Sequence, residues 1–212
     1  MKIMVIIWVE IYTVMIAFKI RGIGENPPPT YQEIRCHMIF VIKMEDFLRE
    51  AWYFARGHTN VAPPTLKYVS VVSRESFHIA LTISAFDDLE VKTSNIQNAY
   101  LTAPCLEKIW TTLCSEFGPN LISKKALVVR DFYGFKSAGS SFRNCLAQCM
   151  RNLGYFFVPG RSIFINKEET RPSDGAKYYV YFLLYVDYCL VVHHAEDTPL
   201  HELDHFFKMK SG

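Results

Sequence analysis

A single acidic residue lies at the tip of a predicted β-hairpin in the C-terminal third of the chain. Residues 177–184 and 189–192 are rich in aromatic and β-branched side chains, which favour strands. The residues between them read Tyr185-Val186-Asp187-Tyr188, so Asp187 is the one carboxylate on the turn. Because the flanking strands hold such a turn rigidly, its carboxylate points outward and is a candidate ligand for Mg²⁺.

A second set of candidate catalytic residues is His201-Glu202-Leu203-Asp204-His205, which fits the H-E-x-x-H pattern of zinc-protease helices. Two histidines four residues apart can bind one Zn²⁺, with the glutamate as general base. A third ligand normally follows, but residues 206–212 contain no His, Asp, Glu or Cys. The amphipathic pattern of this helix, predicted to begin at Thr198-Pro199, leaves both histidines exposed and buries Leu200, Leu203, Phe206 and Phe207. A zinc protease is therefore a remote alternative.

Three blocks, in this order, resemble the reverse transcriptases of copia-type retrotransposons. Residues 91–101 (Val-Lys-Thr-Ser-Asn-Ile-Gln-Asn-Ala-Tyr-Leu) resemble the first catalytic block of that family. Residues 131–137 (Asp-Phe-Tyr-Gly-Phe-Lys-Ser) resemble its Leu-Tyr-Gly-Leu-Lys segment, and the hairpin tip resembles its Tyr-x-Asp-Asp turn. Residues 68–75 also resemble the segment before the palm, so the resemblance covers residues 18–212.

The resemblance implies templated nucleotidyl transfer catalysed by two Mg²⁺ or Mn²⁺ ions, which lie roughly 3.5–4 Å apart in such sites. Asn95 stands where the family has its first catalytic Asp, and Tyr188 stands where it has the second acid of the turn. Asp187 is then the surviving metal ligand. An amide is neutral, and a phenol with a pKa of about 10 carries no charge at neutral pH. We therefore expect an inactive fragment, a pseudoenzyme, with weak metal binding or none.

The resemblance also implies nucleotide-binding roles for Tyr100, Lys136 and Ser137. Tyr100 would lie under the incoming sugar and exclude a 2′-hydroxyl, although a buried aromatic in the first turn of a helix fits the sequence equally well. Lys136 could contact phosphates, and Ser137 stands where many relatives have Gln beside the templating pair. The implied partner is a nucleic-acid primer-template, but a formal net charge of +2 favours only weak binding. A non-catalytic nucleic-acid-binding or interaction module is the alternative hypothesis.

The helices and strands predicted around these residues indicate an α+β fold. Ser73 can cap a helix that ends near Asp87-Asp88, and a strand over 91–96 follows and carries Asn95 at its end. A strand over 126–130 and a helix over 138–153, stopped by Gly154, precede the hairpin. We expect an antiparallel sheet with helices packed on one face, and a solvated loop over 168–175. The resemblance implies that this arrangement corresponds to the polymerase fingers and palm.

The predicted organisation is a fingers-like β-rich region over 1–86, a palm over 87–195 and the start of a connecting helix over 196–212. The resemblance implies that the thumb, connection and RNase H domains are absent from this fragment. With 50% hydrophobic and 21% charged residues the chain is globular. The oligomeric state is left open.

Two further features bear on the cellular location. The six cysteines form no Cys-x-x-Cys pair, which indicates reduced thiols in an intracellular protein, cytoplasmic or nuclear. Residues 3–18 are almost wholly apolar, but Glu10 lies among them and the run is shorter than the ~20 residues that span a bilayer. We expect strands packed within the fingers and no membrane partner.

Overall fold

The computed structural model describes residues 16–22, 24–42, 44, 47, 49–59, 72–157, 164–171, 173–194 and 198–211. These residues form two compact units. The first unit comprises the described residues of Met1–Tyr68 together with Tyr100–Phe142, and the second those of Val69–Ala99 together with Arg143–Gly212. These limits differ from the predicted boundaries at 86 and 195, and the division into fingers and palm stays a prediction. The apolar residues 3–15 lie outside the described part of the chain.

The first unit contains two sheets. Four strands pair in the order β1-β7-β6-β2, with β2 parallel to β6 and the other pairs antiparallel. The second sheet is the antiparallel pair β3-β4. The strands are β1 (Phe18–Ile20), β2 (Gln32–Glu33), β3 (Cys36–Ile42), β4 (Arg49–Ala55), β6 (Ile109–Thr112) and β7 (Lys125–Val128). Two 3-10 turns, η1 (Gly57–Thr59) and η3 (Ser115–Phe117), and most of the short helix α3 (Ala99–Thr102) also belong to this unit.

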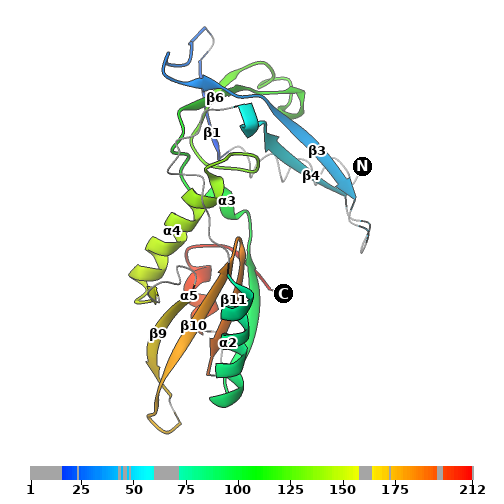
Figure 1. Ribbon diagram of the computed structural model, residues 1–212. Coiled ribbons are helices and arrows are strands. Elements are labelled where there is room, and N and C mark those ends of the chain that lie inside the picture. The colour runs from blue at the N-terminus through cyan, green and yellow to red at the C-terminus, as the bar shows by residue number, and fades with distance from the viewer. Residues whose placement is uncertain are drawn as a thin grey trace. The chain divides into compact units, whose positions relative to one another are not determined.

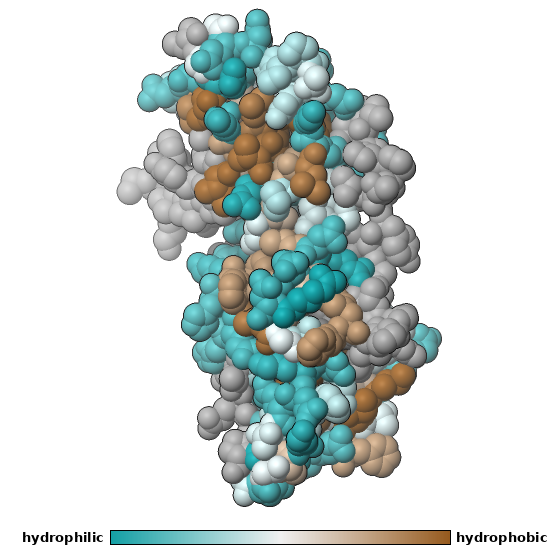
Figure 2. Space-filling view, turned by 90° about the vertical axis from the view of Figure 1, so that its left-hand side faces the viewer, coloured by the Kyte–Doolittle hydropathy of each residue, from teal (hydrophilic) through white to brown (hydrophobic). Residues whose placement is uncertain are grey.

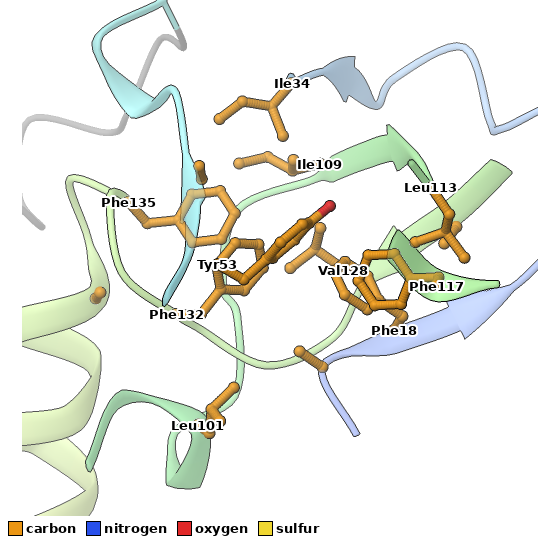
Figure 3. Packing of buried hydrophobic residues seen from close by; sticks show 14 residues of the cluster. Phe18, Ile34, Tyr53, Leu101, Ile109, Leu113, Phe117, Val128, Phe132 and Phe135 are labelled. Carbon is orange, nitrogen blue, oxygen red and sulfur yellow. The ribbon is translucent and has the colours of Figure 1, made fainter. Parts of the chain in front are cut away.

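Aromatic side chains from distant parts of the chain form the core of the first unit (Figure 3). The Phe18 ring on β1 packs edge-on against Tyr53 of β4, with 5.9 Å between ring centroids, and against Phe117 at 5.8 Å. Phe132 packs against Phe18 at 5.6 Å and against Phe135 at 4.6 Å. Such edge-to-face pairs add to the free energy of burying the rings, so they hold β1, β4 and residues 132–135 together.

Gly134 allows the end of β4 to approach this core closely. Its φ is +96°, a conformation that favours glycine, and an added Cβ would lie 2.0 Å from the Ala55 carbonyl oxygen. The Ala55 N–H donates to the Tyr133 carbonyl oxygen at 2.9 Å. The Tyr-Gly pair of this block therefore has a local structural role.

The outer half of β3 is apolar and exposed. Large apolar side chains are also visible on the first unit in the space-filling view (Figure 2). The exposed fractions of Ile39, Phe40, Val41 and Ile42 range from 38% to 62%. No third strand pairs with β3-β4 within the described ranges.

The second unit is built on a six-stranded antiparallel sheet in the order β12-β5-β11-β10-β9-β8. The strands are β5 (Glu90–Ile96), β8 (Phe156–Phe157), β9 (Phe164–Thr170), β10 (Lys177–Tyr185), β11 (Tyr188–His193) and β12 (Met209–Ser211). Helix α2 (Arg74–Phe86) lies along one face of this sheet (Figure 1). Ser73 caps it as expected, because its side-chain oxygen accepts from the Ser76 N–H at 3.1 Å.

The expectation that helices cover only one face of the sheet is wrong. Ala80 of α2 packs in a cluster with Leu183 of β10, whereas the Tyr155 ring packs against Phe182, 5.0 Å away. Adjacent strand residues point to opposite faces, so Tyr155 lies on the face opposite α2. The Tyr155 hydroxyl donates to Glu202 of helix α5 (Thr198–Asp204) at 3.1 Å, which places α5 on that face as well.

Helix α4 (Ala138–Asn152) begins where the sequence predicts and ends one residue before the predicted end at Leu153. Gly154 follows it with a φ of +84°. Its first residues, to Phe142, belong to the first unit, and the remainder belongs to the second. Leu146 and Met150 are buried.

Three smaller expectations also fail. Residues 168–170 belong to β9 and are not part of a loop, so the turn before β10 is shorter than predicted. The C-terminal helix ends at Asp204, and β12 pairs with β5 where the start of a connecting helix over 196–212 was expected. Phe206 is exposed, whereas Leu203 and Phe207 are buried.

Among the described residues, none of the helices has the length and apolar character needed to cross a bilayer.

Candidate functional site

Asp187 lies in a two-residue turn at the tip of the β10-β11 hairpin. Tyr185 and Tyr188 are opposite each other in the register, so only Val186 and Asp187 form the loop. Val186 has a φ of +57°, an unusual conformation for a β-branched residue. The turn therefore has a defined and strained geometry.

Strand β5 runs beside β11 and brings Asn95 to the same tip. Asn95 is directly opposite Tyr188 in the antiparallel register. The Ile96 N–H donates to the Asp187 carbonyl oxygen at 2.8 Å, which fixes the turn against the end of β5. Side chains directly opposite each other have Cβ atoms about 4.5–5.5 Å apart, so Asn95 and Tyr188 are neighbours on one face. The structure thus brings Asn95 beside Asp187 and Tyr188, which lie far from it in the sequence.

The site carries one carboxylate, and its surroundings disfavour the charged form. Asp187 is half-buried, and burial raises the pKa of its carboxyl despite a backbone hydrogen bond that lowers it. The Asn95 Oδ1 atom is buried and has no hydrogen-bond partner within the described part of the chain. Asn95 can offer a neutral carbonyl oxygen to a cation, and the exposed Tyr188 ring offers no charge.

Lys210 is a member of this site that sequence reasoning missed. It lies on β12, directly opposite Asn95 on the side away from Tyr188. The Ser94 hydroxyl donates to the Lys210 carbonyl oxygen at 3.1 Å and joins the two strands. A three-residue strand is too short to show an alternating pattern, so no local signal could have revealed its partner. An ammonium group beside Asn95 disfavours a second cation there.

The predicted nucleotide-binding residues Tyr100, Lys136 and Ser137 lie in the first unit. Tyr100 is half-buried, and its ring packs edge-on against Tyr133 with 5.0 Å between ring centroids. This packing agrees with the alternative in which Tyr100 is an aromatic residue of the core in the first turn of a helix. Lys136 is exposed, and its Nζ donates to the His58 carbonyl oxygen at 3.4 Å. The nucleotide role of Tyr100 and of Lys136 stays a prediction.

Ser137 is placed differently from the expectation. It is fully buried, and its hydroxyl donates to the Glu107 carboxylate in a short hydrogen bond. Buried with it is Asp131, whose side chain is also inaccessible. The hydroxyl of Ser137 is used inside the unit, so its position does not support contact with a nucleotide.

The H-E-x-x-H residues do not form a zinc site in this arrangement. His201 and His205 are exposed on α5. Glu202 accepts from the Lys167 Nζ at 3.0 Å and from the Tyr155 hydroxyl at 3.1 Å, so the proposed general base is used in a structural contact. Within the described ranges, no group of three or more His, Cys, Asp or Glu side chains is arranged to hold a metal ion.

Comparison with known proteins finds no protein family and no curated protein that matches the chain.

Proposed function

We propose that the chain descends from a reverse transcriptase of the RNA-directed DNA polymerase family and that its palm-like second unit no longer catalyses nucleotidyl transfer. The observation that supports this proposal is the register of Asn95 against Tyr188 beside the Asp187 turn. A strand-turn-strand tip next to a strand end is the arrangement in which three acids bind two metal ions. The three motif positions that resemble the family meet at this point.

The loss of activity follows from charge. Two divalent ions bring four positive charges, and carboxylates normally offset part of them. Asp187 supplies one negative charge at most, because Asn95 and Tyr188 are neutral. Lys210 adds a positive charge to the same row of side chains. Mg²⁺ keeps its hydration shell under these conditions, so the primer hydroxyl is not activated.

A primer-extension assay on the full chain, beside a Mn²⁺ titration, tests this proposal. We expect no extension and no saturable Mn²⁺ binding by the unaltered chain. The double variant Asn95→Asp/Tyr188→Asp should bind Mn²⁺, and this restoration is necessary for any extension. The control Thr93→Asp/Tyr179→Asp adds the same charge at exposed positions of β5 and β10. Templated extension by the unaltered chain, or equal Mn²⁺ binding by both double variants, would refute the proposal.

A non-catalytic nucleic-acid-binding module is a second candidate, favoured by the exposure of two tyrosines at the tip. Tyr185 and Tyr188 are opposite each other, and 53% and 57% of their surfaces are exposed. Bases stack on such rings at about 1–3 kcal/mol each, and Lys210 lies in the same cross-strand row. Single-stranded DNA should bind in a salt-dependent way, and Tyr188→Ala should weaken binding about tenfold, whereas Tyr179→Ala should not. Equal loss in both variants contradicts this candidate.

A further inference from the structure

The outer half of strand β3 exposes apolar side chains on both of its faces. Alternate residues of a strand point to opposite faces, so Ile39 and Val41 lie on one face and Phe40 and Ile42 lie on the other. All four are exposed, and Phe40 is the most exposed at 62%. A helix or a ligand that packs on one face of the hairpin covers only two of them. A neighbouring strand covers all four, because it contributes side chains to both faces.

The hydrogen-bond pattern of the hairpin shows which backbone groups of β3 point away from β4. The Arg56 N–H donates to the Arg35 carbonyl oxygen at 2.9 Å, and bonded pairs alternate along an antiparallel ladder. Because Cys36 pairs with Ala55, the odd-numbered residues of β3 bond to β4, and the backbone groups of the even-numbered residues point outward. The Ala55 N–H agrees with this pattern, because it donates to the Tyr133 carbonyl oxygen and not to β3.

The outward edge of β3 lacks the features that usually protect an exposed strand edge. Charged residues, proline or a bulge normally prevent such an edge from pairing with another chain. The seven residues Cys36–Ile42 include no Asp, Glu, Lys, Arg or Pro. They pair with β4 one by one, without a bulge. Within the described ranges, no strand pairs with the outward groups of Met38, Phe40 and Ile42.

The absence of charge on β3 favours a second copy of the chain as the partner. When two copies of one strand pair antiparallel about a twofold axis, the same surface meets itself. A charged residue near the axis would then face a like charge and be repelled. With the axis at Phe40, this residue lies opposite its own counterpart, and Ile39 lies opposite Val41 of the second copy. All of these contacts join apolar side chains.

We propose that the chain forms a twofold dimer in which β3 pairs antiparallel with β3 of a second copy. The two hairpins then form one four-stranded sheet in the order β4-β3-β3-β4. An interface made by one strand edge lies at the low end of the usual size range, so we expect a dissociation constant on the order of micromolar. The dimer is independent of the polymerase proposal, because it uses none of the residues at the Asp187 turn.

Sedimentation equilibrium of the full chain across the micromolar concentration range tests this dimer. We expect a reversible equilibrium between monomer and dimer. Phe40→Glu and Phe40→Lys should each raise the dissociation constant about tenfold or more, because like charges meet across the axis. An equimolar mixture of these two variants should dimerise more tightly than either variant alone, because Glu then lies opposite Lys. Phe86→Lys, the same change at an exposed position of α2 in the second unit, is the matched control and should leave the equilibrium unchanged.

Amide exchange separates loss of pairing from loss of folding. In the unaltered chain, the Phe40 and Ile42 N–H groups should exchange more slowly at high concentration than at low concentration. The Val41 N–H bonds to β4, so it should stay protected at both concentrations and in Phe40→Lys.

Four results would each overturn the dimer. They are a monomer throughout the concentration range, growth beyond the dimer, equal dissociation constants for the unaltered chain and Phe40→Lys, and no recovery in the mixture of variants. Slow exchange at Phe40 in a chain that stays monomeric shows that another segment of the same chain pairs with this edge, and it also overturns the proposal.

Discussion

Lys210 on β12 lies directly opposite Asn95 on β5, and Asn95 lies directly opposite Tyr188 on β11. This row of three side chains combines a cation, a neutral amide and a phenol at the tip for which the sequence predicts a metal site. The double change Asn95→Asp/Tyr188→Asp would therefore place an ammonium group beside the new carboxylate at position 95. The cation affects any metal bound there, because opposite side chains lie within about 5.5 Å of each other at Cβ.

The first prediction concerns this lysine. In the Asn95→Asp/Tyr188→Asp chain, the added change Lys210→Gln should tighten Mn²⁺ binding about tenfold, because it removes a neighbouring positive charge. Calorimetric titration measures the affinity. Lys208→Gln removes the same charge from an exposed position just before β12 and should change the affinity much less. Equal effects of the two lysine changes would show that net charge, not the Asn95 row, controls metal binding.

The second prediction concerns the stability of the turn. Tyr188→Asp places a carboxylate next to Asp187, and neighbouring carboxylates repel each other when no cation is bound. The free energy of unfolding without metal should fall by about 1 kcal/mol, the size of a typical single substitution. Mn²⁺ or Mg²⁺ should then restore part of the loss, since a ligand that binds only the folded state stabilises it. Thermal denaturation with EDTA and with millimolar metal measures both effects, and an identical metal response in the unaltered chain would contradict the assignment of the turn.

The third prediction concerns Asp131, a fully buried carboxyl in the first unit. Neither of its oxygens has a hydrogen bond of good geometry among the described residues. Burial raises the pKa of Asp131 from 3.8 to about 6, and the nearby Ser141 and Cys105 side chains oppose this rise only in part. The folded state therefore binds the proton more tightly than the unfolded state. The contribution of Asp131 to stability should be largest below pH 4, should fall as the pH rises to about 6, and should then level off.

Asp131→Asn should remove this decline and raise the free energy of unfolding at pH 7 by about 2–3 kcal/mol, at 1.36 kcal/mol per pKa unit. Urea denaturation followed by tryptophan fluorescence suits the measurement, because Trp52 and Trp110 both lie in the first unit. Asp88→Asn, at an exposed position of the second unit, is the control. The interpretation fails if the pH dependence survives in Asp131→Asn.

The fourth prediction concerns the contact between α5 and the sheet. Burial lowers the pKa of Lys167, but hydrogen bonds and charges from Glu202 and Glu169 raise it by more, so the pKa is raised overall. Glu202→Gln removes the closer counter-charge and weakens the hydrogen bond from Tyr155. It should lower the free energy of unfolding by about 1 kcal/mol and speed amide exchange in α5 and β12, whereas His201→Gln, on the exposed side of α5, should do neither. Stoichiometric zinc in the purified chain that is lost in His201→Gln and kept in Glu202→Gln would instead revive the protease alternative.

The sequence by itself determined the elements whose signals are local. The Ser73 cap and the Gly154 stop set the limits of two helices, because a capping hydroxyl and a positive φ act on the nearest turn of backbone. The β10-β11 hairpin followed from two runs of β-branched and aromatic residues around a two-residue turn. The meeting of Asn95 with the Asp187 turn was inferred from motif resemblance, and its register became visible only in the sheet.

Only the tertiary structure decided which elements share a sheet and which faces are covered. Tyr155 and α5 lie opposite α2, and β12 pairs with β5, because these arrangements bury Leu203 and Phe207 and satisfy the backbone groups of a short strand. Burial and strand pairing depend on contacts between residues far apart in the chain, and a pattern read along a short window contains no information about such partners.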